Sequence, residues 1–158
     1  MESDIRAEYK IENGHSYIAI PDINFLDNFM EIHKNNENYE GLVYISGDAR
    51  KHKNIDAERI WITGENVENY SHIPPTSVVK ISENIVKYAE NKKLIIMGDN
   101  AGEYMISQNS YKSFLNMINH INDKIMNSNS TFLLEIDENV LDKKELAFLK
   151  RTLHPINF

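Results

Sequence analysis

Aspartates follow four of the five apolar, β-rich runs of the sequence. They are Asp22, Asp48, Asp99 and Asp137. Ligands of open α/β sheets bind at the carboxyl ends of the strands, so these positions are where chemistry is expected. A cluster of such carboxylates could bind a divalent cation or supply an acid/base pair. The competing interpretation is that each aspartate caps a helix or forms a turn, and we favour it because capping needs no further coincidence.

The segment behind the fourth run mixes two glycines, two acidic residues and one aromatic residue. It begins Gly98-Asp99-Asn100-Ala101-Gly102-Glu103-Tyr104 and continues to residue 108. We expect this segment to be a loop. Long ordered loops at the carboxyl end of a strand are often functional, so it is a candidate for a binding site. It either lines a pocket or forms a plain turn over Tyr104 and Ile106. The candidate ligand-binding residues are therefore Asp22, Asp48, Asp99, Glu103 and Tyr104, and no catalytic residue, metal ligand or cofactor is assigned.

The connection after the first run lacks the residues that grip a triphosphate. It reads Pro21-Asp22-Ile23-Asn24, without the glycines that let backbone N–H groups approach phosphates and without a lysine. Asp22 would also place a negative charge where a phosphate would sit. The histidines show no zinc-binding spacing, and no serine lies in a nucleophile elbow. The sequence therefore excludes a P-loop NTPase and favours a non-catalytic role.

Composition narrows the class of protein further. The chain has 158 residues, no cysteine, and 17 Lys plus Arg against 24 Asp plus Glu, giving a net charge of −7. Such a surface repels nucleic acid and anionic membranes. No apolar run approaches the roughly 18 residues of a membrane span, and the first residues are acidic. We expect a cytoplasmic protein with no nucleic-acid or membrane partner.

Hydrophobic periodicity predicts alternating strands and helices. The strands are expected at residues 16–20, 42–46, 59–63, 94–97 and 131–136, the first preceded by an Asn13-Gly14 hairpin turn and a short leading strand. Helices are expected at residues 22–36, 74–91, 111–125 and 143–153. This alternation predicts an α/β three-layer sandwich with a mainly parallel five-stranded sheet. Residues 14–158 form one domain behind an N-terminal extension at 1–13, and Trp61 belongs to its core.

Several segments resemble those of a known family. They are residues 14–20, 41–46, 60–63 and 73–85, then Glu103-Tyr104-Met105-Ile106 with Asn109, and finally Glu135-Ile136-Asp137 with Leu141 and Glu145-Leu146. In order and spacing they resemble the archaeal domain of unknown function 835. The resemblance extends over nearly the whole chain from Gly14.

The resemblance implies a degenerate RecA-like core that has lost its phosphate loop. Domains of this family occur alone or beside sensory and histidine-kinase modules. We therefore expect a non-catalytic sensory or protein-interaction domain of archaeal signalling, with a protein partner or self-association. The alternative is a small-ligand or divalent-metal-binding protein, or an enzyme, that uses the aspartates at the carboxyl ends of the strands.

Overall fold

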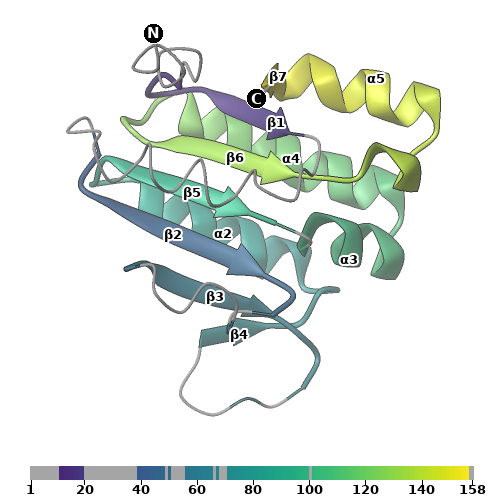
Figure 1. Ribbon diagram of the computed structural model, residues 1–158, viewed down its shortest axis with the longest axis horizontal. Coiled ribbons are helices and arrows are strands. Elements are labelled where there is room, and N and C mark those ends of the chain that lie inside the picture. Colours follow the sequence, from purple (N-terminus) through teal and green to yellow (C-terminus); the bar gives the residue numbers. More distant parts are fainter. Residues whose placement is uncertain are drawn as a thin grey trace, which may run out of the picture.

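A seven-stranded parallel sheet forms the centre of the computed structural model, which describes residues 11–19, 39–48, 50, 56–65, 67, 71–99 and 101–156. The strands are β1 (Ser16–Ala19), β2 (Gly41–Ser46), β3 (Glu58–Ile62), β4 (Ser71–Ile73), β5 (Leu94–Gly98), β6 (Thr131–Glu135) and β7 (His154–Ile156). They lie in the order β4-β3-β2-β5-β6-β1-β7 (Figure 1). Each neighbouring pair is parallel, which confirms the predicted α/β class and strand direction.

The prediction of five strands was wrong, because each edge of the sheet carries one more. Strands β4 and β7 have three residues each, too few for a hydrophobic period to be visible in the sequence. Within β7, Pro155 pairs in register with Ile18. A proline is tolerated there because β7 is an edge strand and one side of it needs no ladder donor.

The predicted hairpin at Asn13-Gly14 is not present. Gly14 does lie in a turn, with a φ of +81° that favours glycine, and its N–H donates to the Ser130 carbonyl oxygen (2.8 Å). Ile11 and Glu12, however, are not in a strand, and residues 1–10 lie outside the described part of the chain. Both edges of β1 are already occupied, by β6 and β7, so no antiparallel partner can pair with it.

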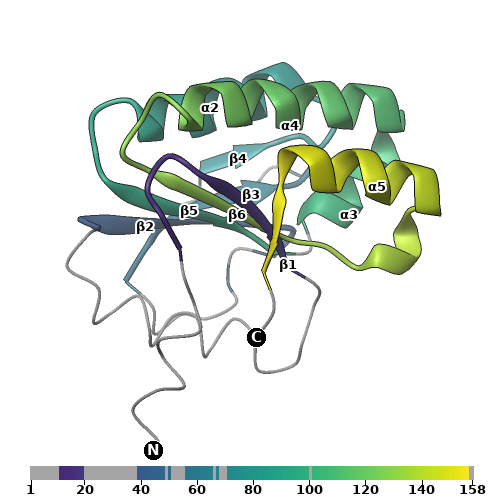
Figure 2. The same ribbon diagram turned by 90° about the horizontal axis from the view of Figure 1, so that it is seen from above.

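The described helices cover one face of the sheet (Figure 2). They are α2 (Val78–Ala89), α3 (Ala101–Gln108), α4 (Tyr111–Ile125) and α5 (Lys143–Thr152), with a short 3-10 turn η2 (Glu138–Val140) before α5. Three of the four helices match the predictions. The fourth, α3, occupies the segment that we expected to be a loop.

Local sequence explains where the helices begin. Ser110 caps α4 by accepting the Ser113 N–H, and the apolar stripe of α4 buries Phe114 and Ile118. At α5, Asp142 and Glu145 form the predicted capping box, in which each side chain accepts the backbone N–H of the other.

Alternate residues of β1, β2, β5 and β6 enter two different apolar clusters. The cluster under the helices includes Val43, Ile96 and Phe114. The cluster on the opposite face, which we call the second face, includes Tyr44, Met97 and Leu133. The helix predicted at residues 22–36, which would supply the third layer of a sandwich, lies outside the described residues.

Within the described ranges, no helix is both long enough and apolar enough to cross a membrane.

Candidate functional site

The carboxyl ends of β2 and β5 form the point where the chain changes direction across the sheet. These two strands are neighbours, but β2 continues to β3 on one side and β5 continues to β6 on the other (Figure 1). Connections that leave neighbouring strands in opposite directions open a crevice, and α/β proteins bind ligands there. The strand order thus singles out the ends of β2 and β5 as the favoured place for a ligand. The sequence alone did not distinguish them from the other strand ends.

Asp99 lies at this switch point and is buried, with 5% of its surface exposed. Its backbone N–H continues the ladder to β2 by donating to the Ile45 carbonyl oxygen (3.2 Å). The Tyr44 hydroxyl donates a short hydrogen bond to Asp99 Oδ2. The other carboxyl oxygen, Oδ1, is buried and has no hydrogen-bond partner among the described residues. A buried acceptor without a donor is costly, so this atom is the feature of the edge that most requires explanation.

The surroundings of Tyr44 keep its hydroxyl protonated. Burial, and then the neighbouring Asp99 carboxylate, raise the pKa of Tyr44 far above its usual value, while a hydrogen bond from Ser46 and the charge of Arg59 act in the opposite direction. The Arg59 guanidinium lies over the Tyr44 ring, 5.5 Å from its centroid. Tyr44 is therefore a permanent donor to Asp99 at any physiological pH.

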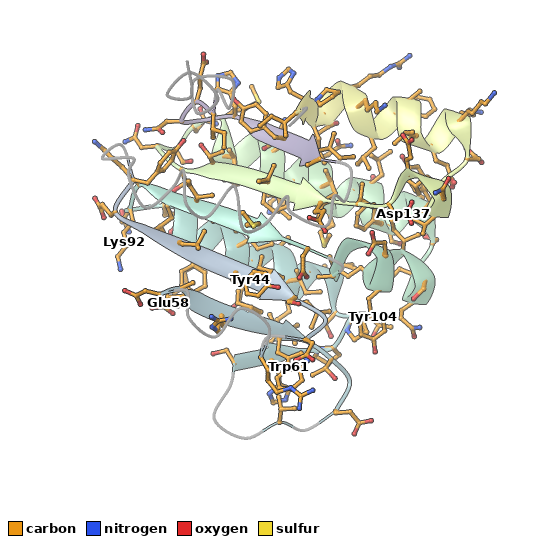
Figure 3. All side chains as sticks on the ribbon, in the orientation of Figure 1. Tyr44, Glu58, Trp61, Lys92, Tyr104 and Asp137 are labelled. Carbon is orange, nitrogen blue, oxygen red and sulfur yellow. The ribbon has the colours of Figure 1, made fainter. Side chains whose placement is uncertain are left out.

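Asp48, two residues after the end of β2, is hydrogen-bonded to Arg50. Its carboxylate receives Arg50 Nε (3.0 Å), Arg50 Nη2 (3.1 Å) and the Arg50 backbone N–H (3.1 Å). The same guanidinium lies 5.4 Å from the centre of the Trp61 ring, and Trp61 Nε1 donates to the Gly47 carbonyl oxygen (3.0 Å). Trp61 is thus half-buried at the rim and not in the core as predicted (Figure 3).

Glu103 and Tyr104 lie on helix α3 and not on a loop. Glu103 Oε1 accepts the Asp137 N–H (2.6 Å), which joins α3 to the end of β6. Tyr104 packs against the cluster under the helices. The helix can approach the sheet because Gly98 and Gly102 have no side chain: a Cβ on either would lie 3.2 Å from Leu134 Cδ1. Asp99 therefore lies between two glycines, Gly98 and Gly102, whose backbone closely approaches Leu134 of β6.

The structure places the five predicted ligand-binding residues differently. Asp48 and Asp99 follow the neighbouring strands β2 and β5. Glu103 and Tyr104 lie on helix α3, which begins two residues after Asp99. Asp22 lies outside the described residues. The described residues contain no group of three His, Asp or Glu side chains that could hold a metal ion.

Sequence reasoning missed Tyr44 and Ser46. Both alternate along β2 with residues of the helical face, so they share the second face with Asp99, and Ser46 Oγ accepts the Asp48 N–H (3.0 Å). The signal was present as two hydroxyl side chains, Tyr44 and Ser46, two positions apart in an otherwise apolar strand. It became readable only once β5 was known to lie beside β2.

These features define an α/β domain with a fully parallel sheet and a polar residue cluster at its switch point. The chain belongs to the family described as protein of unknown function (DUF835), whose sequence model matches residues 26–153. No curated protein matches the chain. A solved protein from Pyrococcus horikoshii OT3 has a similar fold, with a TM-score of 0.62 and 13% identity, covering 93% of this chain and 84% of that one.

Proposed function

We propose that this domain is a non-catalytic sensor of a small ligand, built on a RecA-like scaffold that has lost nucleotide hydrolysis and serving in archaeal signalling. The parallel sheet with an interior first strand supports the scaffold part of the proposal. The segment Pro21-Asp22-Ile23-Asn24 after that strand supports the loss of hydrolysis, because it offers no glycine or lysine to a phosphate.

The observation that carries the ligand site is the unpartnered Asp99 Oδ1 at the switch point. A buried carboxylate oxygen without a donor is satisfied by an N–H group of a ligand, and a hydrogen bond to a charged acceptor is among the stronger ones. Tyr44 already occupies Oδ2 and orients the carboxylate. We therefore assign the site to small molecules that carry an amino, amidine or ring N–H group.

A panel of nitrogen-donor compounds tests this assignment. Guanidines, primary amines, nucleobases and nucleosides are screened by thermal shift, and binding is measured by calorimetry. We expect a compound of this class to bind the natural chain, and Asp99→Asn to weaken its binding at least tenfold because the amide presents a donor or a weaker acceptor.

Asp123→Asn is the matched control, because it removes the same charge from an exposed position of α4. It should leave binding unchanged. Equal affinity of the Asp99→Asn variant would contradict the site, as would a panel without any binding at millimolar concentration.

The loss of hydrolysis has its own test. Incubation with ATP and magnesium should give no phosphate release above background and no binding at micromolar concentration. Turnover above background would remove the proposal that the scaffold is degenerate.

A sensor must pass its state to another chain, so the proposal includes a protein partner or self-association. Light scattering of the purified domain measures the second of these. A mass that stays at the 18.4 kDa of one chain across concentrations would leave a different protein as the partner.

A further inference from the structure

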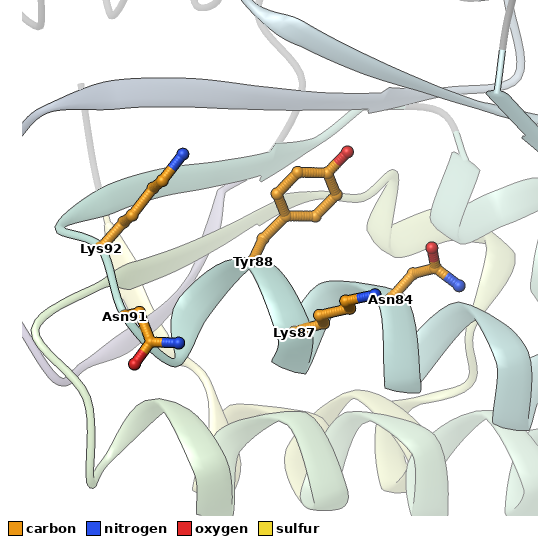
Figure 4. A pocket seen from close by; sticks show the side chains of 5 residues that line it. All are labelled: Asn84, Lys87, Tyr88, Asn91 and Lys92. Carbon is orange, nitrogen blue, oxygen red and sulfur yellow. The ribbon is translucent and has the colours of Figure 1, made fainter.

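The amino edge of the sheet, opposite the switch point, carries two adjoining cavities. One, which we call the lysine cavity, has a volume of about 340 Å³ and is lined by Asn84, Lys87, Tyr88, Asn91 and Lys92 (Figure 4). The other, the acidic cavity, has a volume of about 250 Å³, and its lining includes the carboxylates of Glu40, Asp56 and Glu58. Tyr88 and Lys92 line both cavities, so the two are parts of one cleft.

The charges around this cleft do not neutralise one another. Among the described residues, ion pairs join Glu12 with His15 and Asp48 with Arg50, both elsewhere in the fold. Neither Lys87 nor Lys92 forms an ion pair with a carboxylate of the described residues. The lysine cavity is therefore lined by two cationic residues and no acidic one, whereas the acidic cavity combines three acidic residues with Lys92.

Tyr88 lines both cavities, and its hydroxyl contacts the acidic one. Its hydroxyl donates to Glu58 Oε2 (3.1 Å), which ties the end of α2 to the start of β3. Tyr88 and Lys92 point to the same side of the helix end (Figure 4). In the lysine cavity, Asn84 Nδ2 donates to the Lys80 carbonyl oxygen (2.9 Å), so its amide orientation is also set. The cleft is thus partly organised without a ligand.

We propose that this cleft binds a zwitterion of the amino-acid or short-peptide class, with the ligand carboxylate at Lys92, which lines both cavities, and the ligand ammonium group against Glu58 and its acidic neighbours. A simple anion fits less well, because it leaves the three acidic residues of the acidic cavity without a cationic ligand group. A simple cation leaves the two ammonium groups without a partner. A ligand with both charges matches both cavities, and the volume of the lysine cavity, about 340 Å³, is in the range of small-molecule sites.

Glycine peptides with and without blocked ends provide the test. Glycine, glycylglycine and triglycine are titrated into the labelled full chain, and binding is followed by the NMR shifts of the Tyr88 and Lys92 amides. We expect the shifts to saturate at millimolar concentration for at least one member of the series. N-acetylation or C-terminal amidation of that peptide should each weaken binding at least tenfold, because each removes one of the two charges. Equal binding of the blocked peptides, or no shifts with any of the three, would overturn the proposal.

Substitutions locate the binding in the cleft. The double variant Lys87→Met, Lys92→Met keeps the long side chains but removes both charges, and we expect it to abolish saturable binding. Lys80→Met is the matched control, because Lys80 is an exposed residue of the same helix outside both cavities. Binding that survives the double substitution, or is lost in the control, would place the peptide elsewhere. Asp99→Asn should have no effect, which separates this site from the one at the carboxyl edge.

Discussion

The two edges of the sheet hold their charges in opposite ways. At the carboxyl edge, one carboxylate is buried, takes a hydrogen bond from Tyr44 and leaves a single oxygen without a donor. At the amino edge, several charges of both signs line an open cleft, and the exposed Lys87 and Lys92 are unpaired within the described residues. Burial makes the first arrangement costly and directional, whereas solvent screens the second. The carboxyl edge therefore holds one charge in a buried and directed position, whereas the charges of the amino edge are open to solvent.

Of the substitutions considered, Tyr44→Phe at the carboxyl edge should lower stability most, and Tyr88→Phe at the amino edge provides the direct comparison. Tyr44→Phe leaves Asp99 with both oxygens unsatisfied, so we expect the free energy of unfolding to fall by about 1–3 kcal/mol. Tyr88→Phe removes a hydrogen bond to the exposed Glu58 and should cost below about 0.5 kcal/mol. Urea unfolding measures both. Similar losses at the two tyrosines would break the comparison.

Glu103→Ala should have the next largest effect, because Asp137 then loses the acceptor of its backbone N–H. Hydrogen bonds to charged acceptors that are partly buried support a loss of about 1–2 kcal/mol. Glu103→Gln retains an oxygen acceptor at the same place, so thermal unfolding should show a loss less than half as large. If the two variants unfold alike, the contact does not hold α3 to the end of β6.

Alkaline pH should reduce the difference between the natural chain and Tyr44→Phe. Burial and the Asp99 carboxylate raise the pKa of Tyr44 in the folded state. Above pH 10 the unfolded chain therefore releases this proton while the folded chain keeps it, and stability falls as the pH rises. Between pH 9 and 11 we expect the advantage of the natural chain to shrink by on the order of 1 kcal/mol.

Four other tyrosines also have a raised pKa. At alkaline pH they lower the stability of the natural chain and of the Tyr44→Phe variant by the same amount. They are Tyr17, Tyr39, Tyr88 and Tyr111. Only the difference between the two urea midpoints reports on Tyr44. A difference that stays constant over this range would show that Tyr44 ionises normally.

The smallest effect is expected at the amino edge. Lys87→Met with Lys92→Met should change the free energy of unfolding by less than about 0.5 kcal/mol, because both side chains are exposed and unpaired with any described carboxylate. A loss above about 1 kcal/mol in urea would mean that the lysines serve the fold and not a ligand.

Longer elements of the fold were predictable because their periods are visible over several turns. The stripe of α4 and the capping box of α5 appear in the sequence and in the structure alike. Helix α3 was missed because its eight residues include Gly102, and its apolar stripe is weak. Its position depends on the room that Gly98 and Gly102 leave for Leu134, which is a property of packing between distant segments.

The candidate site was predictable only as separate residues. The positions of Asp48 and Asp99 after strands were readable, but nothing local indicated that β2 and β5 are neighbours. Tyr44, whose hydrogen bond orients Asp99, precedes it by 55 residues, so their contact is a consequence of strand order. The cleft at the amino edge likewise combines residues before β2 and β3 with the end of α2.

The place of β1 in the sheet has a consequence for how the protein folds during synthesis. Both of its partners, β6 and β7, lie more than 100 residues later in the chain, so β1 is synthesised well before the strands that pair with it. Contacts between such distant segments form slowly, and an unpaired apolar strand is prone to aggregation until they do. The apolar residues of β1 therefore wait for most of the domain to be synthesised before β6 can cover one of its edges.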